Sequence, residues 1–156
     1  VGAGTGATVS GWRGCEAVRK GGLGSASLEV GDAVFGALAV VNAVGDVFSL
    51  EGEPLTGGPL VPPITPSPPS QAELANTTLL ALVTDASLSR TDLMRLNVRG
   101  HDAIGACVRP GHTRYDGDTC FVIAGGRADA DIDQLGEAAF TVTATAIVNA
   151  ILEAQS

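Results

Sequence analysis

The sequence has few aromatic residues, few basic residues and few cysteines. Aromatic side chains make up 4% of the 156 residues, whereas glycine occurs 21 times, so the core must be packed from Ala, Val, Leu and Ile with backbones in close approach. The chain is 45% hydrophobic and 17% charged, which is enough apolar material for one compact core and too little for two ordinary domains. We therefore expect one domain made of sheets and helices that touch through small residues.

The scarcity of basic residues limits the partners. Lys and Arg number 9 against 17 Asp and Glu, which gives a net charge of -8. Because nucleic-acid affinity comes largely from Lys and Arg that release counterions, we expect no nucleic-acid binding. The most apolar stretch, Val34 to Val41, is far shorter than the roughly 20 residues that cross a bilayer, so we also expect no membrane span.

The three cysteines, Cys15, Cys107 and Cys120, form an odd set without a CxxC pair. This pattern argues against a disulfide framework and favours a reducing compartment, the cytoplasm. Cys107 and Cys120 could be combined with His101 and His112 around zinc, but the spacings match no usual structural zinc site. We instead expect buried thiols, His101 on a helix surface or lining a site, His112 in a loop, and neither a metal nor a cofactor.

The N-terminal third reads as short β segments separated by glycines. The pattern predicts a turn at Ala17 to Gly24 and strands at Ser25 to Val30 and Ala33 to Asn42. The second strand is almost continuously apolar, so we expect it to be buried on both faces. The run Gly2 to Ala7 (GAGTGA) has the glycines of a dinucleotide fingerprint, but no strand precedes it and no helical pattern follows, so a glycine-rich turn or strand edge is expected.

Residues 51–70 differ sharply from the segments around them. They hold seven of the eight prolines, including Pro62-Pro63 and Pro68-Pro69. Such a composition predicts an exposed, partly extended linker, where mobility and proteolysis concentrate.

The C-terminal half alternates strands and helices. We predict a strand at Thr77 to Asp85, a helix at Ser89 to Cys107 capped by Ser89 or Thr91, a buried strand at Thr119 to Ala124, and a long apolar helix at Leu135 to Ala154. The order of strands, linker, strand, helix, strand and helix favours an α+β layered fold rather than a regular βαβ repeat.

Asp116-Gly117-Asp118 precedes the predicted strand at Thr119 to Ala124, and its residue types are typical of an ordinary turn. A calcium loop needs more acidic positions in series than this segment offers. If the segment is extended, however, two carboxylates two positions apart point the same way, and one of them can orient the other.

The most informative position is the junction of the linker with a strand, Asn76-Thr77-Thr78. It reads either as a strand that begins with two threonines or as a self-cleavage site. In the second interpretation the Thr77 hydroxyl attacks the preceding carbonyl and cuts the chain, which leaves the Thr77 α-amine free. An α-amine, with an unperturbed pKa of about 7.7 to 8.0, then lies beside the hydroxyl as a base.

Several segments together resemble the DmpA-like aminopeptidases and the related endo-type nylon-oligomer hydrolases of peptidase family S58. They follow the order of that family over nearly the whole chain: VGAGTGA (1–7), KGGLGSAS (20–27), GALAVVNAVGDV (36–47), NTTLLALVTDASL (76–88) and RGHDAIGACVRPGHTRYDGDT (99–119). The last two segments are the specific ones.

The resemblance implies a four-layer αββα sandwich, made as one precursor and cut autocatalytically into a longer α chain and a shorter β chain. Residues 1–76, with the linker, would end the α chain, and residues 77–156 would form the β chain. Members of the family carry well over a hundred residues before the GAGTG block. Because the chain begins at Val1 without Met and inside a glycine-rich pattern, we expect it to be the C-terminal part of such a precursor.

The resemblance also implies roles for single residues. Thr77 would be the nucleophile and Asn76 the new C-terminus. Asp116 and Asp118 would assist by hydrogen-bonding the Thr77 amine and hydroxyl and each other.

Lys20 and Asn42 would lie near the reacting carbonyl and stabilise negative charge or lower the pKa of the amine. Without the family, Lys20 reads as a solvated turn lysine and Asn42 as a cap at a strand end.

The expected activity is hydrolysis of amide bonds in peptides or in ω-amino-acid (nylon-type) oligomers. Acyl transfer of the ornithine acetyltransferase type is an alternative, because those enzymes also mature before a Thr. A third possibility is a non-catalytic fragment or interaction module that is never cut. Family members often form tetramers, so we expect a homo-oligomer.

Overall fold

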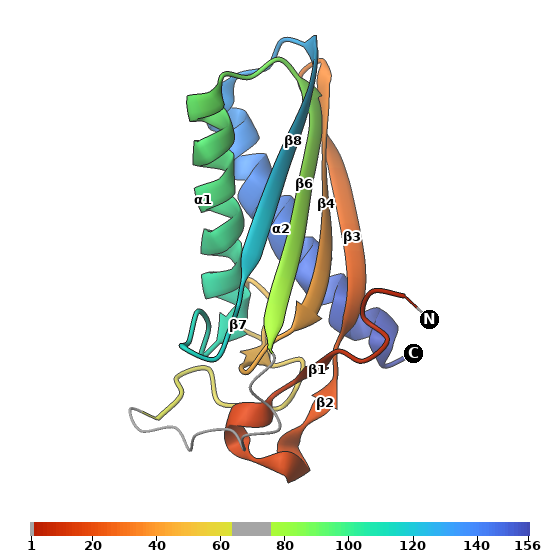
Figure 1. The fold of residues 1–156 in the computed structure, drawn as a ribbon, viewed down its shortest axis with the longest axis vertical. Coiled ribbons are helices and arrows are strands. Elements are labelled where there is room, and N and C mark those ends of the chain that lie inside the picture. Colours follow the sequence, from red (N-terminus) through yellow and green to blue (C-terminus); the bar gives the residue numbers. More distant parts are fainter. Residues whose placement is uncertain (1, 64–75) are drawn as a thin grey trace.

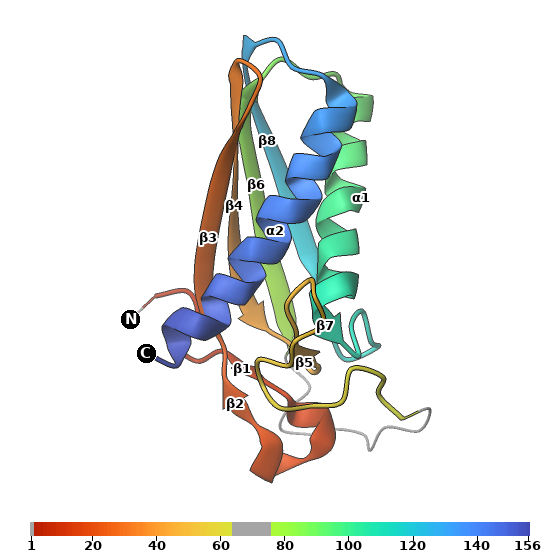
Figure 2. The ribbon, with the colours of Figure 1, turned by 180° about the vertical axis from the view of Figure 1, so that it is seen from behind.

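A four-stranded sheet with both long helices on one face forms the body of the protein. The computed structural model describes residues 2–63 and 76–156. The sheet has the order β3-β4-β6-β8, and α1 and α2 cover one side of it (Figures 1 and 2). The bounds of these elements are β3 Gly22–Val30, β4 Ala33–Asn42, β6 Thr77–Ala86, α1 Arg90–Cys107, β8 Thr119–Ala128 and α2 Ile132–Ala154.

The predicted order of strands and helices is confirmed. β3, β4 and β6 are antiparallel neighbours, whereas β6 and β8 are parallel and are joined through α1. A parallel pair requires such a crossover, so β6, α1 and β8 form a single βαβ unit within the α+β fold.

Short elements gather at one end of the sheet. β1 (Thr8–Val9) pairs with β2 (Arg19–Lys20), and β5 (Asp46–Val47) pairs with β7 (Val108–Arg109). The prediction of a turn at residues 17–24 is wrong, because β2 and the start of β3 occupy most of that segment. The glycines that suggested a turn are instead needed for close packing.

Both long helices begin at side-chain caps. The Ser89 hydroxyl accepts a hydrogen bond from the Asp92 N–H, and the Asp92 side chain accepts one from the Ser89 N–H, which completes a capping box. The Asp131 carboxylate accepts hydrogen bonds from the N–H groups of Asp133 and Gln134. The structure therefore selects Ser89 over Thr91 as the cap of α1.

The contact between α2 and β3 depends on residues without side-chain bulk. A Cβ on Gly24 would lie 2.2 Å from the Ala146 carbonyl oxygen and 2.3 Å from the Ala150 nitrogen. A Cβ on Gly22 would lie 2.5 Å from the Ala150 carbonyl oxygen. The helix thus rests directly on the strand backbone, as the glycine-rich and alanine-rich composition predicts.

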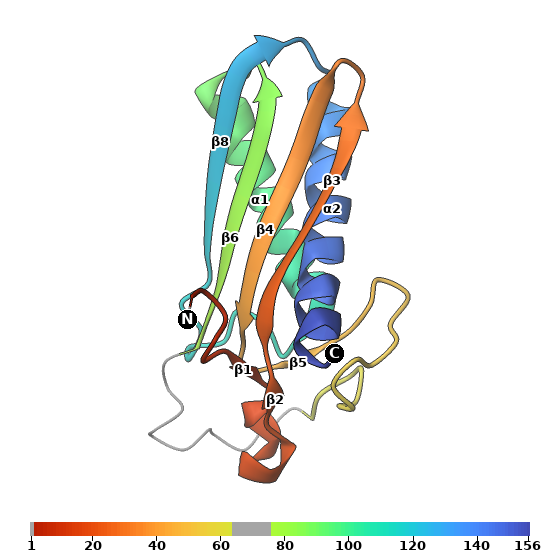
Figure 3. The same cartoon turned by 90° about the vertical axis from the view of Figure 1, so that its right-hand side faces the viewer.

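The opposite face of the sheet is apolar and uncovered by the described residues. Figure 3 shows the four strands in front of both helices. The prediction that residues 33–42 are buried on both faces is wrong for this chain, because Val34 and Leu38 of β4 are 49% and 47% exposed. The prediction of a buried strand at residues 119–124 is also wrong, because Phe121 and Ile123 of β8 are 59% and 57% exposed. In an αββα sandwich the second sheet packs on such a face.

The buried Cys107, the half-buried Cys120 and the apolar helix α2 belong to the covered side of the sheet, whereas Cys15 is exposed. Burial raises the pKa of the Cys107 and Cys120 thiols to about 11, so neither is a ready thiolate nucleophile. No disulfide joins the three cysteines. α2 is long and apolar enough to cross a membrane by length and composition alone, but here it packs against β3, β4 and α1 as a core helix.

The first part of the proline-rich segment is held to the body by a buried carboxylate. Asp46 accepts hydrogen bonds from the Ser10 hydroxyl, the Trp12 indole, the Thr56 hydroxyl and both the Nε and Nη2 of Arg13. The prediction of an exposed linker is therefore wrong at Thr56, which is 6% exposed. Residues 64–70 of that linker lie outside the described part.

Substitution of Gly24 by Ala tests the packing of α2 on β3. Because the new Cβ would overlap the α2 backbone, we expect Gly24→Ala to lower the free energy of unfolding by about 3 kcal/mol. Gly36→Ala is the matched control, since the nearest atom to a Cβ there is 3.7 Å away. Equal denaturation midpoints for the two variants would contradict this packing.

Substitution of Asp46 by Asn tests the buried carboxylate. Burial alone would raise the pKa of Asp46, but hydrogen bonds from Arg13, Ser10, Thr56 and Trp12 outweigh burial and lower the pKa. Its stabilising effect is therefore present above the unfolded-state pKa of about 3.9 and is lost as pH falls through the lower folded-state pKa. We expect Asp46→Asn to lose about 3 kcal/mol at pH 7 and to flatten the decline in stability below pH ~4.

The exposed Asp32 supplies the control for this measurement. Asp32→Asn should change stability by less than about 0.5 kcal/mol and keep the acid decline, as most surface substitutions do. If Asp46→Asn retains the wild-type stability and pH dependence in chemical denaturation, the network does not stabilise the fold.

Candidate active site at the ends of the strands

Five of the six predicted site residues, all except Lys20, come together at one end of the sheet because of strand register. Asn42, at the end of β4, pairs with Thr77, at the start of β6. On the other side of β6, Asn76 forms a parallel bridge with Asp116, just before β8. The start of β6 is therefore flanked by Asn42 on one side and by the segment that begins at Asp116 on the other. Figure 1 shows β6 between β4 and β8.

The Asn76 carbonyl oxygen receives two hydrogen bonds. The Thr77 hydroxyl donates to it at 2.6 Å, and the Gly117 backbone N–H donates to it at 2.9 Å. Asn76 is buried and Thr77 is half-buried. The hydroxyl thus lies beside the carbonyl of the preceding peptide bond, and a fixed N–H points at the same oxygen.

Asp116 fixes the loop on which Gly117 lies. One carboxylate oxygen accepts a hydrogen bond from the Val44 N–H at 3.1 Å. The other accepts from the N–H and the hydroxyl of Thr113, at 3.0 and 2.7 Å. Asp116 therefore ties its own loop to the segment that follows β4.

Asp118 binds the start of β6 directly. Its Oδ1 accepts a hydrogen bond from the Thr78 N–H at 2.8 Å, and its Oδ2 lies 2.8 Å from Nδ1 of His112. The side chain of Asp118 is 4% exposed. The hydrogen bonds expected between Asp116, Asp118 and the Thr77 hydroxyl are not formed in the described chain, because both carboxylates bind backbone and loop groups while Thr77 bonds the Asn76 carbonyl.

Lys20 and Asn42 order the glycine-rich N-terminal segment. The Lys20 ammonium donates to the carbonyl oxygens of Gly4, Thr5 and Ala7. The Asn42 side-chain oxygen accepts a hydrogen bond from the Thr8 N–H at 2.9 Å. This segment is a turn, as predicted, and the Lys20 ammonium is directed at the carbonyl oxygens of that turn.

Two site groups, Gly117 and His112, had no assigned role in the sequence interpretation. A Cβ on Gly117 would lie 3.0 Å from the Thr77 hydroxyl oxygen, so a glycine keeps this approach open. His112 has a left-handed backbone (φ 50°), which turns the loop so that its ring meets Asp118. His101 is partly exposed on α1, and His112 is in a loop, as predicted.

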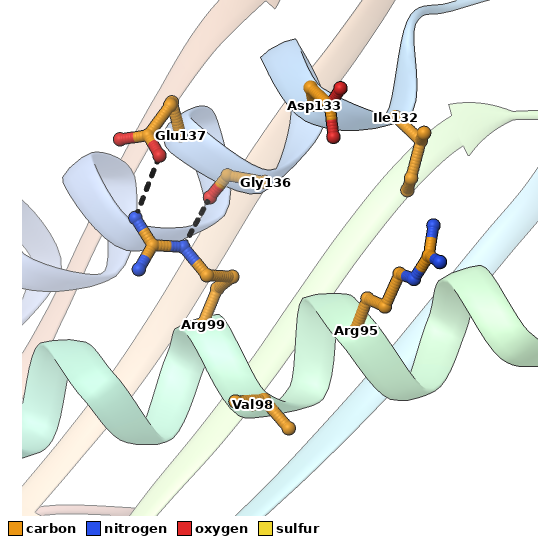
Figure 4. Close-up of a pocket in the computed structure, with 7 residues that line it drawn as sticks. All are labelled: Arg95, Val98, Arg99, Ile132, Asp133, Gly136 and Glu137. Atoms are coloured by element: carbon orange, nitrogen blue, oxygen red, sulfur yellow. Dashed lines mark hydrogen bonds and ion pairs between the residues drawn. The ribbon is translucent and has the colours of Figure 1, made fainter.

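A separate pocket lies between the helices, away from the start of β6. It has a volume of about 520 Å³ and is lined by Arg95, Val98, Arg99, Ile132, Asp133, Gly136 and Glu137 (Figure 4). Arg99 spans it by donating to the Gly136 carbonyl and to Glu137, so its charge is already paired. Within residues 2–63 and 76–156, no three His, Cys, Asp or Glu side chains are grouped to hold a metal ion.

The comparison of sequences finds relatives among aminopeptidases. The profile of peptidase family S58 matches residues 1–156. An uncharacterised aminopeptidase of Mycobacterium leprae is 35% identical, over 100% of this chain and 49% of its own length. An uncharacterised aminopeptidase of Mycobacterium tuberculosis is 35% identical over 69% of this chain and 36% of its own length. The chain thus spans half or less of the curated relatives it matches.

Solved structures share the fold. The L-aminopeptidase D-Ala-esterase/amidase of Ochrobactrum anthropi, described as a variant of the Ntn hydrolase fold, superposes with a TM-score of 0.69 at 24% identity, over 98% of this chain and 44% of that one. A β-aminopeptidase of a Burkholderia species gives a TM-score of 0.67 at 26% identity, over 96% of this chain and 44% of that one. The helical layer and the sheet described above thus share a fold with these structures. With the family profile matched over its whole length, the chain belongs to peptidase family S58.

Proposed function

We propose that this protein is an N-terminal-nucleophile amide hydrolase that cuts its own Asn76–Thr77 bond and then uses Thr77 as its catalytic residue. The observation that carries the proposal is the pair of hydrogen bonds on the Asn76 carbonyl oxygen, from the Thr77 hydroxyl at 2.6 Å and the Gly117 N–H at 2.9 Å. Attack on a carbonyl requires a nucleophile next to it and a donor for the oxygen that becomes negative. Both are present at this one bond.

In the proposed self-cleavage, Oγ1 of Thr77 attacks the carbonyl carbon of Asn76. The hydroxyl proton passes to the Thr77 nitrogen as the carbon–nitrogen bond breaks, and the Gly117 N–H stabilises the oxyanion in between. The Asn76 acyl group is then an ester of Oγ1. Water hydrolyses this ester to give an Asn76 carboxylate and a Thr77 residue with a free hydroxyl and a free amine.

The mature site would repeat the chemistry on a substrate amide. The Thr77 amine accepts the hydroxyl proton as Oγ1 attacks, and it returns a proton to the leaving amine. Water then releases the acyl group from Thr77. Asp118 keeps the start of β6 in place through the Thr78 N–H, and Asp116 keeps the Gly117 loop in place through Val44.

Two substrate classes are proposed: peptides and ω-amino-acid oligomers. Their names as aminopeptidases favour peptides that carry a free amino end. The threonine nucleophile and the Asp116-Gly117-Asp118 segment lean towards ω-amino-acid oligomers instead. Amino-acid anilides and 6-aminohexanoate oligomers, compared by product formation with the same enzyme sample, distinguish the two classes.

Paired substitutions of neighbouring threonines test the cleavage. Protein made from the complete gene should yield a chain whose N-terminus reads Thr77-Thr78-Leu79, seen by intact mass and N-terminal sequencing. Thr77→Val should remain whole and inactive, because the attacking oxygen is gone. Thr77→Ser keeps that oxygen and should be cut.

Thr78→Val is the matched control, since it makes the same change one residue later. The Thr78 hydroxyl is buried and has no hydrogen-bond partner among residues 2–63 and 76–156, so its loss should cost little stability and leave cleavage intact. Wild-type protein that stays whole, or Thr77→Val protein that is cut at the same bond, would overturn the proposed function.

A further inference from the structure

His112 occupies a position whose charge matters to the proposed nucleophile. Its two ring nitrogens each face an oxygen: Nδ1 lies 2.8 Å from Oδ2 of Asp118, and Nε2 lies 3.2 Å from the backbone carbonyl oxygen of His101. A carbonyl oxygen only accepts hydrogen bonds, and so does an ionised carboxylate. Both contacts are hydrogen bonds to an ionised Asp118 only when both ring nitrogens carry protons, which is the imidazolium form.

Asp118, the carboxylate that contacts the His112 ring, is almost fully buried. The Asp118 side chain is 4% exposed, and its other oxygen binds the Thr78 N–H at 2.8 Å. Successive residues of an extended strand advance about 3.5 Å, so the nitrogen of Thr77 lies within roughly 6 Å of this carboxylate. The amine that self-cleavage frees would therefore feel the charge of Asp118.

An unpaired carboxylate at that distance would work against the chemistry. A negative charge within about 6 Å favours the protonated form of an amine, and an ammonium group is no base. A positive charge bonded to the far oxygen of the same carboxylate offsets that field while Asp118 still binds the strand. With His112 beside it, Asp118 can bind the start of β6 while the Thr77 amine stays neutral.

We propose that His112 is a positioning residue of the active site, which pairs with Asp118 so that this carboxylate anchors the start of β6 without holding the Thr77 amine in its protonated form. The inference rests on the proposed function, because it concerns the amine that self-cleavage would expose. The titratable groups that face the pair are His101 on α1, whose ring centroid lies 5.2 Å from that of His112, and Asp116 in the same loop.

The His112→Asn variant removes the positive charge of the ring but keeps a hydrogen-bond donor for Asp118. Asn tolerates the left-handed backbone at φ 50° and offers an uncharged N–H donor close to where Nδ1 lies, but it removes the positive charge. In the mature enzyme we expect the acid limb of the kcat/KM profile to move up by about one pH unit, while the rate on the alkaline plateau stays within a few fold of wild type. His101→Asn, which keeps the backbone carbonyl that binds Nε2, should leave the limb in place.

A cavity-rescue experiment tests the positive charge of the His112 ring in a second variant. His112→Gly also tolerates the backbone and opens a ring-sized space at a side chain that is 39% exposed. In the mature His112→Gly enzyme, imidazole, which becomes a cation, should move the acid limb of the kcat/KM profile back to its wild-type position, whereas pyrazole, a ring of the same size that stays neutral near pH 7, should not.

The outcomes separate the two proposals. Cleaved wild-type enzyme with an unshifted acid limb in His112→Asn, or equal rescue by imidazole and pyrazole, would overturn the role of His112 and leave Thr77 as nucleophile. Wild-type protein that is never cut would overturn the proposed function, and the role of His112 would fall with it.

Discussion

The hydrogen bond from the Gly117 N–H to the Asn76 carbonyl oxygen, at 2.9 Å, is the contact on which the candidate site depends. It extends the parallel ladder of β6 and β8 beyond the strands and joins Asn76 to the Asp116 loop. Parallel pairing requires a long crossover, so α1 and its capping box at Ser89 are part of the same arrangement. The helical layer thereby determines which loop faces the Asn76–Thr77 bond.

The loop is held from both of its ends. Asp116 binds the Val44 N–H after β4, and Asp118 binds the Thr78 N–H on β6. Two carboxylates so close to one another repel unless each has its own donors. The two carboxylates have different side-chain partners: the Thr113 hydroxyl donates to Asp116, and the His112 ring contacts Asp118. Asp116 therefore fixes its own loop, whereas Asp118 fixes the start of β6.

The sequence predicted most of the elements and the main chemical groups. A nearly continuous apolar run located β4, and β-branched content and length located β6. Apolar residues at helical spacing located α1, a long apolar segment located α2, and the linker-to-strand junction drew attention to Thr77. The predictions of burial were wrong. An apolar run such as residues 33–42 indicates that both faces of a strand are apolar, but it does not indicate whether other parts of this chain cover both faces. The structure shows one face packed on helices and the other exposed.

The contacts between distant segments could not be read from local patterns. Nothing in the neighbourhood of His112 specifies that its left-handed backbone aims the ring at Asp118, because that contact depends on the tertiary position of α1. The same is true of Asp46, whose buried partners lie in segments 10–13 and 56–58. The Asp-Gly-Asp pattern drew attention to Asp116 and Asp118, and family resemblance supplied their expected roles. The alternation of an extended chain did not predict that they would bind different partners.

The most direct test of the central claim is the location of the acyl group in enzyme quenched during turnover of an amide or ester substrate. Tandem mass spectrometry should place the added acyl mass on the hydroxyl of Thr77, in a chain whose N-terminus is Thr77 itself. An acyl group on any other residue, or on a Thr77 still joined to Asn76, would contradict the account.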